Sequence, residues 1–124
     1  MKTLIALAID SDENSLNLLS ELLEGVKNTS EVFCASNALD GLRILESRFD
    51  INVVFVDFNL PLMNGREFLH NLAKRGMLNI PVIVTSTDEN ARGAAFRAGA
   101  FDFLAKPINK ARLKEKIERV LAQI

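Results

Sequence analysis

Short apolar runs alternate strictly with longer amphipathic stretches along this chain of 124 residues. A short apolar run bounded by turn-forming residues predicts a buried strand, and an apolar stripe that recurs every three or four residues predicts a helix. Strands are expected at 3–9, 31–35, 52–56, 80–85 and 101–105, and helices at 15–26, 38–46, 66–74, 90–98 and 110–121. This alternation predicts parallel strands joined by helical crossovers.

Right-handed crossovers and helices on both faces leave few arrangements for five parallel strands. The predicted fold class is therefore α/β: a flavodoxin-like, doubly wound, five-stranded parallel sheet of order 2-1-3-4-5 with five helices. No repeat, linker or low-complexity stretch interrupts the pattern. We therefore expect a single domain over residues 1–124, with no output domain.

The composition argues against several classes of protein function. Fifteen Lys and Arg residues balance sixteen Asp and Glu residues, which argues against a nucleic-acid binder that relies on bulk positive charge. No apolar run is long enough to span a bilayer, and residues 1–9 lack the features of a signal peptide. The single cysteine, Cys34, lies in an apolar stretch and is expected to be a reduced core thiol. These features predict a cytoplasmic protein without membrane or direct nucleic-acid contacts.

Polar side chains gather where the predicted strands end. Asp10 and Asp12 follow the first strand, Asp57 follows the third, residues 85–87 end the fourth and Lys106 follows the fifth. In a sheet of this order, ligands bind outside the carboxyl ends of the strands, at the switch point between strands 1 and 3. The sequence therefore predicts a crevice that contains carboxylates, hydroxyls and one ammonium group.

This set of groups suits phosphoryl chemistry. Crowded carboxylates repel one another, and a hard cation such as Mg²⁺ relieves the repulsion. A lysine ammonium can pair with a phosphoryl oxygen, and an aspartate can act as a nucleophile that forms an acyl phosphate. Positioning and charge neutralisation supply most of the catalysis in phosphoryl transfer.

Four stretches carry a family resemblance: "LAIDSDENSLNLL", "VVFVDFNLPLMNGREFL", "IPVIVTST" and "RAGAFDFLAKPI". Over its whole length the chain resembles a response-regulator receiver domain of two-component signalling, of the chemotaxis-regulator-like kind. The run from Asp57 through Pro61, Met63 and Gly65, followed by Lys106 and Pro107, is specific as a set.

The resemblance implies a phosphorelay switch. Asp57 would accept a phosphoryl group from a histidine kinase or phosphotransfer protein, and Lys106 and Ser86 would hold the product oxygens. Ser86 and Phe103 take the family's two switch positions. A downstream protein would read the change on strands 4 and 5 and helices 4 and 5. The chemistry is limited to phosphoryl acceptance and autodephosphorylation, so the chain is not expected to be an enzyme in the usual sense.

The resemblance also implies a Mg²⁺ site. Its ligands would come from Asp10, Asp12, Asp57 and the backbone carbonyl of Asn59. The peptide bond from Lys106 to Pro107 is typically cis in this family, which costs little before proline.

The sequence departs from the family pattern in two places, and the first of them, Ser11, favours an alternative function. Ser11 stands where the family usually has a second acid that ligates the metal directly, so Mg²⁺ binding should be weakened unless Asp12 replaces that ligand. The segment from Ser86 to Gly99 is about two residues shorter than the family pattern, which predicts a short or irregular fourth helix. The alternative is a pseudo-receiver, a protein-interaction module with weak or no Mg²⁺-dependent phosphorylation.

Other interpretations stay open at this stage. Asp12 suits a helix N-cap as well as a metal site, and Thr85 and Thr87 compete with Ser86 for the switch position. Phe103 could be a core residue, and His70, with no Cys or His partner, is expected on the surface. A flavodoxin-like enzyme or nucleotide binder is a third hypothesis, but acids replace the glycine-rich phosphate loop after the first strand.

Overall fold

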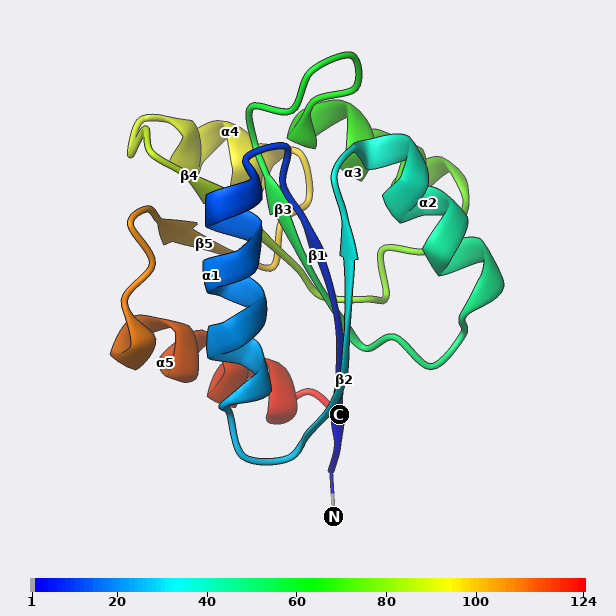
Figure 1. The fold of residues 1–124 in the computed structure, drawn as a ribbon. Helices are drawn as coiled ribbons and strands as arrows, with labels where there is room; N and C mark the ends of the chain where they lie inside the picture. Colours follow the sequence, from blue (N-terminus) through cyan, green and yellow to red (C-terminus); the bar gives the residue numbers. More distant parts are fainter. Residues whose placement is uncertain (1) are drawn as a thin grey trace.

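A computed structural model describes residues 2–124 and contains one five-stranded parallel sheet of order β2-β1-β3-β4-β5 (Figure 1). The strands are β1 Leu4–Ile9, β2 Thr29–Ala35, β3 Val53–Asp57, β4 Val82–Ser86 and β5 Asp102–Ala105. The helices are α1 Glu13–Glu24, α2 Ala38–Ser47, α3 Gly65–Lys74, α4 Ala91–Arg97 and α5 Lys110–Leu121. The predicted fold class and strand order are confirmed.

Apolar side chains cover both faces of the sheet and form two core clusters. Leucines and Phe68 of α2 and α3, with alanines of α4, pack on one face. Leu19 and Leu23 of α1 pack with Leu113 and Ile117 of α5 on the other face. Every residue of β3 and β4 is buried, as expected for central strands with helices on both sides.

The helix boundaries follow their capping residues. Asp12 caps α1 and Asn64 caps α3 with a side-chain oxygen, and these helices begin two residues and one residue before their predicted starts at 15 and 66. Helix α4 is seven residues long and receives no side-chain cap bond from Asn90, which agrees with the short fourth helix expected from the sequence. Among residues 2–124, no helix is both long enough and apolar enough to cross a membrane.

The prediction of a core thiol at Cys34 is wrong, because this side chain is exposed. Cys34 lies on β2, an edge strand that is hydrogen-bonded only to β1 and carries several exposed positions. The apolar run around it therefore does not require burial on both faces. His70 is exposed on α3, as predicted.

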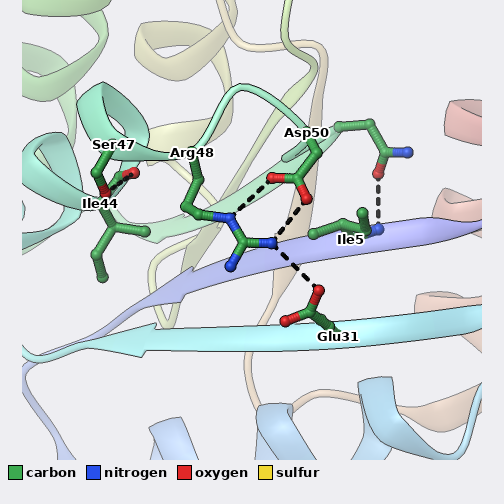
Figure 2. A network of polar contacts seen from close by, with 7 residues as sticks. Ile5, Glu31, Ile44, Ser47, Arg48 and Asp50 are labelled. Carbon is green, nitrogen blue, oxygen red and sulfur yellow. Dashed lines mark hydrogen bonds and ion pairs between the residues drawn. The ribbon is translucent and has the colours of Figure 1, made fainter.

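Arg48, just after α2, joins the following loop to the edge strand (Figure 2). Its guanidinium donates to the Asp50 carboxylate at 3.0 and 2.7 Å and to Glu31 of β2 at 3.2 Å. The guanidinium carbon also lies 4.6 Å from the centre of the Phe33 ring. The hydrogen bond from Arg48 holds the pKa of the Asp50 carboxyl below its usual value.

Candidate functional site

Parallel pairing brings the ends of four strands to one edge of the sheet. The polar residues that end these strands or follow them directly are Asp10 after β1, Asp57 in β3, Ser86 in β4 and Lys106 after β5. Asp57 lies opposite Thr85 in the β3–β4 ladder. The backbone N–H of Lys106 donates to the carbonyl of Ser86 at 2.8 Å, which holds the backbone of Lys106 against the end of β4.

The Lys106 ammonium lies between two carboxylates. Its Nζ is 2.6 Å from Oδ2 of Asp10 and 3.5 Å from Oδ1 of Asp57. The Lys106 side chain is 11% exposed and that of Asp10 is 3% exposed, so these charges are largely removed from water. The peptide bond from Lys106 to Pro107 is cis, as the resemblance implied.

Burial raises the pKa of Asp57 above its ordinary value. Lys106 opposes this rise, the negative charge of Asp10 adds to it, and the backbone N–H of Asn59 lowers it again. The crevice therefore holds more negative charge than one ammonium group satisfies, so further positive charge would favour an ionised Asp57.

Asp12 does not join this pair of carboxylates directly. Its oxygens accept hydrogen bonds from the backbone N–H of Asn14 at 3.1 Å and from Ser15 Oγ at 3.0 Å, which makes it the N-cap of α1. Its own N–H donates to Oδ1 of Asp10 at 2.9 Å. Both Ser11 and Asp12 are exposed. A role for Asp12 as a metal ligand therefore stays a prediction.

The oxygen donors at this edge of the sheet are few, but they are of the kind that Mg²⁺ takes. Within residues 2–124, no group of three or more His, Cys, Asp or Glu side chains is arranged to hold a metal ion. Mg²⁺, however, usually takes one or two carboxylates and completes its shell with carbonyl, water and phosphate oxygens. Asp10 and Asp57, with the backbone carbonyl of Asn59, match that requirement.

Ser86 and Thr85 are both buried at the end of β4, whereas Thr87 is exposed. Ser86 Oγ accepts a hydrogen bond from the backbone N–H of Asp88 at 3.0 Å. Phe103 is fully buried in β5, and the guanidinium carbon of Arg92 lies 4.8 Å from the centre of its ring. Phe103 is thus a core residue in this conformation, and its switching role stays a prediction.

The loop after β3 approaches α3 closely. A Cβ atom on Gly65 would lie 2.8 Å from the Cα of Phe58 and 3.1 Å from the carbonyl oxygen of Asp57, so only glycine fits at the start of this helix. Leu62, at the tip of the loop, has a φ of +68° and is 102% exposed. A leucine is costly in this left-handed conformation and buries nothing here.

Two contacts of charged side chains near Phe103 were not predicted from the sequence. Asp102, which precedes Phe103, is 2% exposed and lies 2.5 Å from Arg119 and 3.3 Å from Lys116 of α5. An acid inside an apolar strand, with two cations three residues apart on the last helix, could have indicated this pairing. No sequence signal indicated the contact between Arg92 and Phe103.

Known proteins match both the sequence and the fold. The family model of the response regulator receiver domain matches residues 6–118. An uncharacterized response regulatory protein of Vibrio cholerae is 36% identical over 97% of this chain and 49% of its own length. A cyclic di-GMP phosphodiesterase response regulator of Xanthomonas campestris is 28% identical over 91% of this chain and 30% of its own length. The chain thus spans half or less of the length of these curated relatives.

Solved structures agree with this assignment. A response regulator from Chloroflexus aurantiacus superposes with a TM-score of 0.88 at 25% identity, over 98% of this chain and 99% of its own. The response regulator domain of Thermotoga maritima CheB superposes with a TM-score of 0.83 at 25% identity, over 98% of each chain. With the strand order, the paired carboxylates and the matched sequence, these likenesses show that the chain belongs to the response regulator receiver domain family of two-component signalling.

Proposed function

We propose that this receiver domain accepts a phosphoryl group on Asp57 from a phosphohistidine of a histidine kinase or phosphotransfer protein. An Asp57 carboxylate oxygen attacks phosphorus, the new O–P bond forms, and the N–P bond breaks with its electron pair returning to the donor imidazole. The observation that carries the proposal is the position of the Asp57 carboxylate, 3.5 Å from Lys106 at the carboxyl edge of the sheet.

Lys106 and Ser86 would hold the product. The ammonium of Lys106, already shared by two carboxylates, can pair with a phosphoryl oxygen, and the hydroxyl of Ser86 can donate to another. Receiver domains usually bind Mg²⁺, and here Asp10, Asp57 and the carbonyl of Asn59 would hold it. When bound, the metal would neutralise part of the charge on the transferring group.

The signal would reach the surface through a population shift. Ser86 Oγ accepts a hydrogen bond from the backbone N–H of Asp88, and a turn of this side chain toward the phosphoryl group would break that bond. That movement would loosen the segment before α4, whose Arg92 covers the ring of Phe103. A downstream protein would then recognise the altered surface of β4, β5, α4 and α5. Hydrolysis of the acyl phosphate by water would reset the switch.

Phosphodonor labelling tests this function. Purified protein is incubated with acetyl phosphate and Mg²⁺, and the intact mass and the modified peptide are measured. One phosphoryl group on the peptide that contains Asp57 is expected, and Asp57→Asn should abolish it while the variant still unfolds cooperatively on heating. Labelling that persists in Asp57→Asn would mean that another residue accepts the phosphoryl group.

The pseudo-receiver is the second candidate function, and two observations favour it. Ser11 removes a carboxylate from the edge of the site, and Asp12 is engaged as the cap of α1. Ser11→Asp discriminates the two candidates when Mg²⁺ is titrated during acetyl phosphate labelling. A switch with a weakened metal site should be labelled at lower Mg²⁺ in Ser11→Asp than in the native protein. A native protein that stays unlabelled at every Mg²⁺ concentration, while Ser11→Asp is labelled, would identify a pseudo-receiver.

A further inference from the structure

A cleft of about 410 Å³ lies between α3 and α4, on residues that take no part in the crevice around Asp57. Its lining consists of one stripe from each side: Arg66, His70 and Ala73 from α3, and Ala94 and Arg97 of α4 with its C-cap residue Ala98. Residues three or four apart share one side of a helix, so each stripe forms one wall of the cleft.

The cleft carries uncompensated positive charge. Within residues 2–124, Arg66, His70 and Arg97 take part in no side-chain hydrogen bond or ion pair, and the lining contains no acidic residue. Most other arginines are paired with a carboxylate: Arg43, Arg48, Arg75, Arg92 and Arg119. Two unpaired guanidinium groups on facing walls create a local positive potential that attracts anionic groups.

Small residues keep the cleft open. Its remaining lining is made of three alanines, whose methyl groups leave room above them. On α4, Gly93 leaves space for the arginine one turn later, because a Cβ atom there would lie 3.1 Å from Nη1 of Arg97. A glycine inside a helix is destabilising relative to alanine. Its presence in this short helix coincides with the close approach of the Arg97 guanidinium to the helix at this position.

We infer that this cleft binds an acidic segment of a partner protein. The donors are spread over both walls, with Arg66 and His70 one turn apart on α3 and Arg97 on α4, so an extended segment can contact all three. Carboxylates pair with guanidinium groups, and an imidazole N–H donates in either protonation state. The methylene stems of Asp and Glu would pack on the alanines.

Protein carboxylates match the cleft better than a nucleic acid does. The net charge of the whole chain is −1. A phosphate backbone requires several Lys and Arg contacts along its length, and its affinity depends on many released counterions. The binding inferred here does not require phosphorylation of Asp57, so it goes beyond the proposed function.

Titration of the ¹⁵N-labelled 124-residue chain with acetylated hexaglutamate amide at low ionic strength tests the inference. Amide shifts should concentrate on residues 66–73 and 93–98. Arg66→Gln with Arg97→Gln should weaken the binding about five- to thirtyfold, because two charged contacts are lost. The matched control is Arg43→Gln with Arg112→Gln, which removes the same charge elsewhere and should weaken binding by less than about twofold at the same salt concentration.

Three outcomes would overturn the inference. One is an equal loss of affinity in both double variants, which would mean that diffuse charge attracts the peptide. Another is the absence of localised shifts at any peptide concentration. The third is a single-stranded DNA oligonucleotide of equal charge that shifts the same amides with equal or higher affinity, which would assign the cleft to nucleic acid. Thermal unfolding of all variants is measured first, and it should match the native protein because the substituted arginines are exposed.

Discussion

At the scale of single residues, the charge state of Asp57 depends on the balance between its burial and the charges around it. Burial and the neighbouring Asp10 raise its pKa, while Lys106 lowers it, so an ionised Asp57 costs the folded protein stability. Their meeting at one edge of the sheet could be predicted from the sequence, because each residue ends or follows a predicted strand. Their exact partners could not, since Lys106 lies nearer to Asp10 than to Asp57.

Asp57→Asn should stabilise the protein at neutral pH. The folded state holds a proton on Asp57 more tightly than the unfolded chain does, so the native protein loses stability as the pH rises from about 3.8 through the raised pKa. Asparagine removes that loss. Urea unfolding between pH 3 and pH 8 measures the free energy of unfolding of both proteins. The advantage of Asp57→Asn over the native protein should be present at pH 7 and shrink as the pH falls.

Asp50→Asn is the control for this pH series, and its effect on the free energy of unfolding should have the opposite sign. Arg48 lowers the pKa of Asp50, so this group contributes stability above its ordinary pKa, and the contribution is lost as the pH falls. Asp50→Asn should therefore destabilise the protein at neutral pH and have no effect in acid. A gain in stability for Asp57→Asn that is constant with pH would contradict the role of its carboxylate charge.

Leu62→Gly should raise the free energy of unfolding by about 1 kcal/mol. The leucine adopts a φ of +68°, which glycine tolerates, and its exposed side chain contributes no packing that the substitution would remove. Leu62→Ala keeps the Cβ atom and should show no such gain. Equal stability changes in the two variants, measured by urea unfolding, would argue against strain at this position.

At the scale of the elements, the hydrophobic pattern predicted all ten helices and strands, and the remaining differences have local causes. Asp12 begins α1 at Glu13, two residues before the predicted start, because a capping side chain extends a helix beyond its apolar stripe. Strand β2 starts at Thr29 instead of residue 31, since an edge strand pairs through its backbone and needs no apolar side chains to do so.

Gly65→Ala should destabilise the protein by about 1–3 kcal/mol. The new Cβ atom would meet the backbone of Phe58 at 2.8 Å, and backbone yields less than a flexible side chain. Gly25→Ala is the matched control, because its Cβ atom would make only ordinary contacts of 3.5 Å or more. The stability that each variant loses relative to the native protein is measured by thermal unfolding. A loss no larger in Gly65→Ala than in Gly25→Ala would show that α3 can shift away from the loop.

At the scale of the whole molecule, the strand order follows from the alternating pattern, because right-handed crossovers permit few topologies. That order is enough to bring residues from opposite ends of the chain, such as Asp10 and Lys106, into contact. Pairings that depend on a rotamer, such as Arg92 over Phe103, lie beyond the pattern, because periodicity gives the side of a helix and not the conformation of its side chains.

We propose that the carboxyl edge of the sheet forms a pocket for a phosphoryl group on Asp57 and that this pocket is coupled to Ser86 and Phe103. Beryllofluoride, a phosphoryl mimic, tests it most directly when added with Mg²⁺ to ¹⁵N-labelled protein. We expect amide shifts at Asp57, Ser86, Phe103 and Lys106 in the native protein and none in Asp57→Asn. Unchanged spectra of the native protein at saturating Mg²⁺ and beryllofluoride would contradict it.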